Sequence, residues 1–293
     1  MKFFNRAFLA TFVTVSLLGL SGCVIVDANG KNYIGEKSTI KPNGKITSKN
    51  YNLKTITSVN LTSMPDVVIT QGKNQKVTVK ASSNIISYCR LTESNGTLNI
   101  SLTKEAESKR FKDFDMVIYV TVKNIENVKT SGTGDVKFQG SIKSQNLNLT
   151  TSGTGDISLP IFSGESLKVG ITGTGDVSIG GKAKIAKLSV SGTGDIDAKL
   201  DGLDKLSANV SGTGDVNLKG TALNAEYSVS GTGDIYAKNL IAKRVKAYAT
   251  GTGDITCYAS EAFSGNRSRV ASITCYGKPK NRDFHTDGYS FPD

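Results

Sequence analysis

Histidine and zinc-type cysteine pairs are almost absent from this chain of 293 residues, which has one histidine, His285, and four cysteines without a CxxC spacing. A structural zinc site uses closely spaced cysteine and histidine ligands, so no metal site and no cofactor are predicted. The sequence also has no nucleophile elbow, and His285 lies in the C-terminal tail, away from any motif. The chain is therefore predicted not to be an enzyme.

Long apolar runs are also missing, apart from one at residues 7–20. This run is shorter than the roughly 20 residues that span a membrane, and the basic residues before it are typical of a secretory signal. It ends in the sequence L-S-G-C at Cys23, which resembles the lipobox of bacterial lipoproteins. The resemblance implies that residues 1–22 are removed and that acyl chains on Cys23 anchor the chain to a membrane. The alternative is an ordinary cleaved signal with an incidental cysteine.

The predicted localisation is the cell envelope, since the signal exports the chain and the lipid on Cys23 holds it. Val24 follows this cysteine, where an aspartate would resemble the inner-membrane retention signal of enterobacteria. An outer-membrane destination is therefore favoured over an inner-membrane one.

The net charge is +11, with 36 Lys and Arg against 25 Asp and Glu. Such a balance favours an acidic partner or an anionic surface. The alternative is that lysine occupies outward strand positions and edges, where it discourages aggregation. Nucleic acid is not a predicted partner, because the basic residues are scattered among acidic ones and no stacking platform appears.

Residues 23–50 are rich in Asn, Lys, Gly and Ser, which predicts the lipidated cysteine followed by a flexible tether. From residue 51 on, β-prone runs such as 53–61, 98–102 and 116–122 are separated by Gly and Asn. These runs predict a β-rich N-terminal part, with a charged loop or helical turn at 104–110.

A motif of the type S-G-T-G-D occurs seven times between residues 131 and 254. Its first glycine is Gly132, Gly153, Gly173, Gly192, Gly212, Gly231 and Gly251. A period near 20 residues is typical of a solenoid. Each unit has two alternating apolar runs and no helical period of useful length. The sequence therefore predicts an all-β fold, a parallel β-helix with coils of about 20 residues.

The repeats also predict the core, because side chains two apart in a strand share a face. The branched residue after each motif aspartate forms one inward column: Val136, Ile157, Val177, Ile196, Val216, Ile235 and Ile255. The residue two positions later forms a second: Phe138, Leu159, Ile179, Ala198, Leu218, Ala237 and Cys257. A run before the motif adds further inward positions, such as Leu147 and Leu149.

An eighth, degraded coil is predicted at the C-terminal end, because the sequence I-T-C-Y at 273–276 repeats that at 255–258. Terminal solenoid repeats are commonly atypical. The repeats then occupy residues 131–277, within a β-solenoid domain at 51–277. The tail at 278–293 is predicted either to cap the open end through its aromatic residues or to be disordered.

The seven motifs, preceded by a β-rich part, resemble the head GIN-domain family, whose members are described as heads of auto-transporter adhesins. The resemblance covers about residues 53–277. It implies a right-handed, three-sided β-solenoid secreted to the bacterial envelope. Adhesion is a hypothesis within the family itself, so no binding residue is carried over, and this chain shows no autotransporter barrel.

The motif has two interpretations. Glycine allows a positive φ and a close approach of neighbouring coils, while aspartate can accept amide hydrogen bonds as in an Asx turn. The rival is a calcium ladder along Asp135, Asp156, Asp176, Asp195, Asp215, Asp234 and Asp254. Exposed charges about 4 Å apart repel by only about 1 kcal/mol in water, so the ladder needs no metal. The structural interpretation is preferred.

Cys257 and Cys275 fall in the same inward column of successive coils. Their Cα atoms should lie within the range of a disulfide, which an oxidising envelope would permit. A buried pair of reduced thiols is the alternative. Cys89 is left over and is predicted to be a small buried apolar residue.

Together these observations predict a non-enzymatic envelope lipoprotein whose β-solenoid binds a ligand in the manner of an adhesin. The flat polar surface of the coils could hold an extended polymer, such as a polysaccharide, or another cell-surface component. Two alternatives stay open: a polysaccharide-acting lyase or hydrolase, and a purely structural envelope component.

Overall fold

The structure, a computed structural model, describes residues 25–26, 32–33, 37–284 and 290–292. The chain forms two units, residues 1–38 and 39–293. In the first unit, β1 (Ile25–Val26) pairs antiparallel with β2 (Asn32–Tyr33). The second unit contains all the repeats and is the part that the following paragraphs describe.

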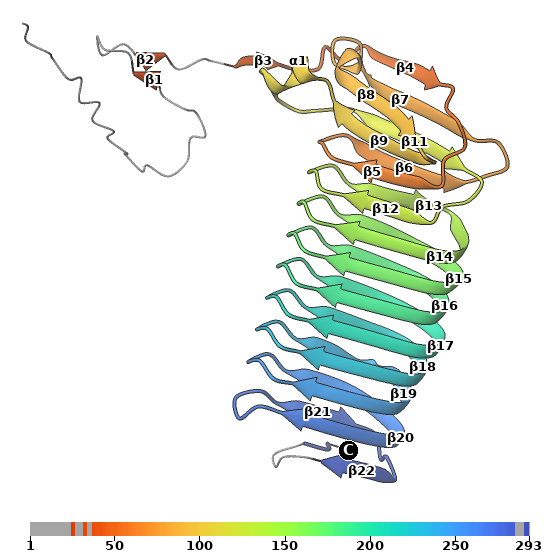
Figure 1. Cartoon of the computed structure of the whole chain (residues 1–293), viewed down its shortest axis with the longest axis vertical. Helices are drawn as coiled ribbons and strands as arrows, with labels where there is room; N and C mark the ends of the chain where they lie inside the picture. Colours follow the sequence, from red (N-terminus) through yellow and green to blue (C-terminus); the bar gives the residue numbers. More distant parts are fainter. Residues whose placement is uncertain (1–24, 27–31, 34–36, 285–289, 293) are drawn as a thin grey trace, which may run out of the picture. The chain divides into compact units, whose positions relative to one another are not determined.

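The repeats form a stack of coils with parallel strands (Figure 1). Most coils are one long bent strand that starts directly after the motif aspartate. The strands are β13 (Val136–Gln139), β14 (Ser141–Thr151), β15 (Ile157–Ile171), β16 (Val177–Val190), β17 (Ile196–Val210), β18 (Val216–Val229), β19 (Ile235–Ala249) and β20 (Ile255–Arg267). Cα partners lie one repeat apart, as for Ile157 with Val177. The predicted parallel β-helix with coils of about 20 residues is confirmed.

Each coil has three sides, which we name by their order after the motif aspartate. In β15 the first side turns Ile157 and Leu159 inward, the second Phe162, and the third Leu167 and Val169. Every residue of the two predicted columns is at most 4% exposed. The core is therefore a set of apolar ladders along the axis, as the repeat spacing predicts.

The motif glycines are needed because the coils approach closely. A Cβ added to Gly153 would lie 2.0 Å from the carbonyl oxygen of Gly132, and one added to Gly155 would lie 2.0 Å from that of Gly134. None of the motif glycines has a positive φ. The sequence offers two reasons for these glycines, a positive φ and the close approach of neighbouring coils. The structure supports the close approach.

The motif aspartates form hydrogen bonds between coils. The amide N–H of Asp156 donates to Oδ1 of Asp135 at 3.1 Å, and the amide of Asp176 donates to Oδ1 of Asp156 at 2.9 Å. The pattern continues to Asp254, whose Oδ1 accepts the amide of Ser272 at 2.7 Å. The donor is therefore the equivalent residue of the next coil, and not a neighbour within the same turn as in an Asx turn.

One coil precedes the first motif, and the sequence repeat does not reveal it. β5 (Ser58–Leu61) and β6 (Asp66–Gln71) pair in parallel with β12 (Asn127–Thr130) and β13. Asp66 stands in the ladder, since its Oδ1 accepts the amide of Asp135 at 3.0 Å. The rest of this corner has no glycine. Each motif glycine packs against the corner of the coil before it. No such corner precedes residues 62–66, because the strand beside β5 on that side, Thr97–Leu102, is followed by a short helix at Lys104–Glu107.

An insertion of about 55 residues separates this coil from the next one. Its elements are β7 (Lys76–Ser82), the 3-10 helix η1 (Ile86–Tyr88), β8 (Cys89–Ser94), β9 (Thr97–Leu102), α1 (Lys104–Glu107), β10 (Lys109–Phe111) and β11 (Val117–Val122). β9 pairs in parallel with β5, and β11 with β6. The coil of β5 and β6 therefore lies between strands that follow it in the sequence.

Antiparallel strands close the N-terminal end of the stack. β4 (Ile46–Tyr51) pairs with β7, β7 with β11, and β8 with β9. β3 (Ser38–Ile40) and β10 form a separate pair beside α1, which occupies the predicted helical turn at 104–110. Strand pairing of the second unit thus already begins ahead of residue 51. Among the described residues, no helix has the length and apolar character needed to cross a membrane.

The last coil contains β21 (Ile273–Tyr276) and β22 (Asn281–Phe284), both parallel to β20. The ring of Phe291 packs edge-on against Phe263, with centroids 5.8 Å apart, and the guanidinium of Arg282 lies over it. The described part of the tail therefore lies against the final coil. His285 and Tyr289 fall outside the described residues.

The glycine contacts generate the first prediction. Gly194→Ala would place a Cβ 2.2 Å from the carbonyl oxygen of Gly175, whereas Gly202, with φ +73, has no atom within 4 Å of an added Cβ. We expect Gly194→Ala to lower the free energy of unfolding by about 3 kcal/mol through overpacking. Gly202→Ala should cost only about 1 kcal/mol of backbone strain. Urea unfolding of both variants measures the difference, and equal losses would contradict the close-approach role.

The aspartate ladder generates the second prediction, which concerns Asp215. Burial and the neighbouring carboxylates of Asp234 and Asp195 raise the pKa of Asp215, whose Oδ1 accepts the amide of Asp234 at 2.7 Å. Asp215→Ala should lower the free energy of unfolding by about 1 kcal/mol through the lost acceptor. Asp215→Asn keeps an acceptor and removes the charge, so it should match or exceed the wild type at neutral pH.

The raised pKa of Asp215 also predicts how the stabilities of the wild type and of Asp215→Asn change with pH. Protonated Asp215 favours the folded state, so its contribution is complete below the unfolded-state pKa and is lost as the pH rises through the folded-state pKa. The advantage of Asp215→Asn should therefore shrink in acid. Urea unfolding at neutral and acidic pH checks this, and an advantage that grows in acid would reject it.

Candidate functional site

The predicted site residues lie in three places. Cys23, the predicted lipid attachment site, is outside the described residues. Cys257 and Cys275 are Cα partners on the first sides of β20 and β21, and both are completely buried. Cys89 is buried at the other end of the solenoid. The repeat thus brings Cys257 and Cys275 together as predicted, far along the chain from Cys89.

The structure contains these three cysteines as free thiols. A hydrogen bond with Cys275, together with burial, raises the pKa of Cys257, while the same bond lowers the pKa of Cys275. Burial raises the pKa of Cys89 to about 11, which leaves it unreactive as a nucleophile. A disulfide between Cys257 and Cys275 stays a prediction, and their register is what supports it.

The aspartate ladder uses one oxygen of each carboxylate for an amide of the next coil. The second oxygen faces outward: Lys137 Nζ lies 3.2 Å from Oδ2 of Asp135, and the hydroxyl of Tyr236 donates to Oδ2 of Asp234 at 2.7 Å. Within residues 37–284 and the other described positions, no cluster of three or more His, Cys, Asp or Glu side chains is placed to hold a metal ion. In the structure, the aspartate ladder joins neighbouring coils through these hydrogen bonds.

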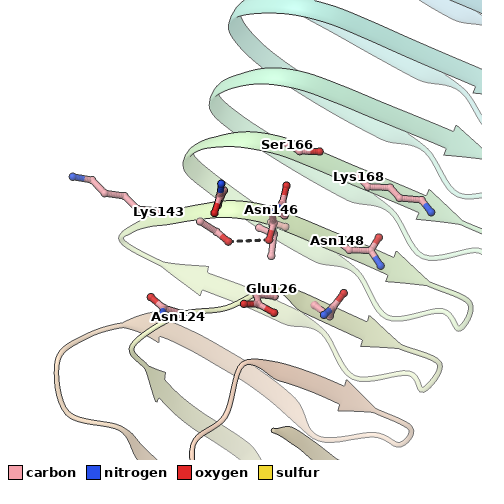
Figure 2. Close-up of a pocket in the computed structure, with 11 residues that line it drawn as sticks. Asn124, Glu126, Lys143, Asn146, Asn148, Ser166 and Lys168 are labelled. Carbon is pink, nitrogen blue, oxygen red and sulfur yellow. Dashed lines mark hydrogen bonds between the residues drawn. The ribbon is translucent and has the colours of Figure 1, made fainter. Parts of the chain in front are cut away.

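A polar hollow of about 630 Å³ lies on the third side, where β12, β14 and β15 meet the loop that precedes β12. Figure 2 shows its amide, hydroxyl and amine groups, with Asn148 and Lys168 on neighbouring strands. The Oδ1 atom of Asn148 is buried and has no hydrogen-bond partner among the described residues. An unpaired buried acceptor is costly, and Asn148 lines the hollow, so a polar ligand here would have an amide beside it.

Outward residues of the third side form a column along the axis. It contains Asn127, Asn148, Lys168, Lys187, Ser207, Glu226 and Lys246, each the register partner of the next. Lys168 and Lys187 are exposed and directly opposite each other, and neither has an ion pair among the described residues. Like charges directly opposite on adjacent strands are destabilising. An anion bound between the two would relieve that repulsion.

A second hollow of about 310 Å³ continues the same side over β17, β18 and β19. Lys205, Asn224, Glu226, Arg244 and Lys246 are among its lining residues. We call the outward surface of the third side, from Asn127 to Lys246, the lysine face. It offers amide and ammonium donors at intervals of one coil, which suits binding of an extended ligand.

The remaining close pairs of acidic and basic groups lie on the exposed second side and, through Arg244, at the edge of the second hollow. Lys184 pairs with Glu165 at 3.0 Å, and Glu261 pairs with both Lys243 and Arg244. These groups are about half exposed, and such pairs contribute little to stability or to chemistry. These pairs are therefore surface contacts between neighbouring coils.

The lysine face was not identified from the sequence. The repeated motif marks only the corners, whereas the lysine face consists of outward positions between the corners. Aligning those positions by repeat would have placed Lys168 and Lys187 side by side, since they stand 19 residues apart.

A sequence profile described as "Putative auto-transporter adhesin, head GIN domain" matches residues 55–201 and 186–279. A crystal structure of a "putative adhesin" from Parabacteroides distasonis superposes with a TM-score of 0.64 at 18% identity, covering 87% of this chain and 99% of the other. A "putative lipid binding protein" from the same species gives 0.63 at 20% identity, covering 87% and 100%.

A "putative adhesin" from Parabacteroides merdae gives a TM-score of 0.57 at 17% identity, covering 87% of this chain and 100% of the other. These likenesses show a shared fold. No curated protein matches the chain. The profile matches, however, span nearly the whole solenoid, from β5 to β21. The chain therefore belongs to the head GIN-domain family.

Proposed function

We propose that this protein is a lipid-anchored, non-enzymatic envelope protein that binds an extended acidic polysaccharide along the lysine face. The family supports an adhesin-like role at the cell envelope or surface. The observation that carries the ligand class is the pair Lys168 and Lys187, opposed at strand spacing without a carboxylate partner among the described residues. A polymer with regularly spaced carboxylates would neutralise both.

The repeat of the solenoid supports a polymer over a small anion. Neighbouring coils are about 4.8 Å apart, which is close to the length of one sugar unit in an extended chain, about 5 Å, so successive coils can meet successive sugar units. The two hollows, with their amide groups, lie along this direction on the same side. Amide groups, including that of Asn148, would bind sugar hydroxyls, while the ammonium groups would bind the acid groups.

The anchoring part of the proposal rests on the L-S-G-C sequence at Cys23 and the apolar run before it. A lipid on this cysteine would hold the solenoid at a membrane, with the outer membrane favoured by Val24. Export would also place the Cys257 and Cys275 pair in an oxidising compartment, where a disulfide across the final two coils can form.

Binding to the lysine face is tested with immobilised polyuronate and, for comparison, a neutral glucan. We expect Lys168→Ala combined with Lys187→Ala to weaken polyuronate binding about tenfold or more, equivalent to about 1.4 kcal/mol. Lys182→Ala is the matched control, since Lys182 is exposed on the second side of the same coil as Lys187. Wild-type affinity should fall as salt is raised.

Equal effects of the control and the double variant, or no polyuronate binding at all, would reject the lysine face. The same assay with calcium and with a chelator shows whether the outward aspartate oxygens take part. Loss of binding in chelator would assign the contact to a calcium-bridged aspartate ladder instead.

Lipid anchoring is tested by Cys23→Ser in a bacterial host supplied with labelled palmitate. The wild-type chain should carry the label and sediment with membranes. The variant should lose the label and appear in the soluble fraction, because a solenoid without acyl chains has only its surface to bind a membrane. Membrane association of an unlabelled Cys23→Ser chain would contradict anchoring at this residue.

A further inference from the structure

The first side of the solenoid departs from its own repeat near the C-terminal end. Two outward positions of each coil, on either side of the second inward column, are compared. In the first five repeats they are Lys137 and Gln139, Ser158 and Pro160, Ser178 and Gly180, Asp197 and Lys199, and Asn217 and Lys219. In the last three they are Tyr236 and Lys238, Thr256 and Tyr258, and Thr274 and Tyr276. Each of the last three coils thus turns one tyrosine outward, and none of the five before them does.

These tyrosines are neighbours in the sheet. Tyr258 is the register partner of Tyr276, and Tyr236 is the partner of Thr256, whose own partner is Thr274. Tyr236 is 45% exposed, and the other two rings are partly exposed. Exposed tyrosines that gather on one face of adjacent strands offer a continuous aromatic surface with hydroxyl groups at its rim.

The side chains of this cluster are held in place before any ligand arrives. The hydroxyl of Tyr236 donates to Oδ2 of Asp234 at 2.7 Å, and this bond raises the pKa of Tyr236 to about 12. Lys238 Nζ lies 3.8 Å from the centroid of the Tyr276 ring. Fixed rings lose little conformational entropy on binding, so more of the contact energy is available for affinity.

Tyr258 leans over a glycine of the adjacent coil. A Cβ added to Gly277 would lie 3.1 Å from Cζ of Tyr258, so the ring depends on the absence of a side chain there. Tyr258 is also partly exposed, so part of its ring surface is accessible from solvent. Such a surface is suited to stack against a flat, weakly polar ring.

We propose that Tyr236, Tyr258 and Tyr276, together with Lys238, form a binding site for one or two pyranose rings of a neutral sugar chain. We call this cluster the tyrosine site. The C–H faces of a pyranose stack on the tyrosine rings. The sugar hydroxyls accept hydrogen bonds from the Lys238 ammonium. They form further hydrogen bonds with the hydroxyls of Thr256 and Thr274.

The size of the cluster favours a sugar over a protein partner. Three strands about 4.8 Å apart span about 10 Å, which matches one or two pyranose rings. A stable protein interface needs about 800 Å² from each partner, supplied by about 20 residues or more. The tyrosine site has six outward residues.

The tyrosine site is independent of the lysine face. It lies on the first side of the last three coils, while the lysine face lies on the third side from Asn127 to Lys246. The ligands differ as well, since one is neutral and the other is acidic. Failure of one proposal therefore leaves the other standing.

The experiment titrates the purified full chain with neutral hexasaccharides of glucose, galactose, mannose and N-acetylglucosamine. The chain has no tryptophan, so its intrinsic fluorescence comes from its ten tyrosines, three of which form the tyrosine site. We expect at least one hexasaccharide to change the emission in a saturable way. Tyr258→Ala and Tyr236→Ala should each weaken binding about tenfold, while Tyr258→Phe keeps the ring and should weaken it less than threefold.

Tyr248→Ala is the matched control, because Tyr248 is an exposed tyrosine of the same strand as Tyr236 but lies on the third side. It should bind like the wild type. Thermal unfolding identifies any variant that does not fold, and Tyr236→Ala decides the matter if Tyr258→Ala fails, since Tyr236 is the most exposed of the three. No saturable change with any of the four sugars overturns the proposal.

Two further results would also overturn it. One is wild-type affinity in both Tyr236→Ala and Tyr258→Ala. The other is self-association of the chain, seen by sedimentation and lost in these variants, which would assign the tyrosines to a contact between two copies.

Discussion

The distance between neighbouring coils is the constraint on which the rest of the solenoid depends. Parallel backbone hydrogen bonds hold adjacent strands about 4.8 Å apart, and the motif corners follow at the same spacing. At that distance no Cβ fits at the corner glycines, where the carbonyl oxygen of the preceding coil would be about 2 Å away. The aspartate that follows then reaches the amide of the next coil. The corner motif is thus a consequence of stacking, although the coil of β5 and β6 and the last coil stack without it.

The same constraint separates the roles of the positions within a coil. Inward positions must fill a narrow interior, so one column contains only valine and isoleucine, while the next mixes large residues with alanine, as in Leu218 followed by Ala237. Corner positions are nearly invariant. Outward positions on the sides are free of both demands, and this is where lysine, asparagine and tyrosine differ from coil to coil. Binding specificity in such a fold is therefore expressed by departures from the repeat, because repetition itself reports only architecture.

Much of the fold could be predicted from the sequence, because the motif spacing and the columns after Asp135 and its equivalents follow directly from strand geometry. The coil of β5 and β6 could not, since its corner has only Asp66 in common with the motif. Its glycines are missing for a physical reason: no corner precedes it. The insertion between β6 and β12 was equally hidden, because pairing of β9 with β5 depends on long-range contacts that no local pattern encodes. The candidate sites were missed for a different reason, as lysine on a strand is also an ordinary solvated residue.

The position of the β5 and β6 coil has a mechanical consequence. A chain pulled from its N-terminus receives the force first through β3, which pairs with β10, then through β4, which pairs with β7, and then through β5. β4 can be peeled away, but β5 is hydrogen-bonded along both edges, to β9 and to β12. Force applied from the tethered end would have to shear two ladders at once to extract it. A solenoid pulled from its N-terminal end would therefore resist unwinding coil by coil, because β5 is held between two neighbouring strands.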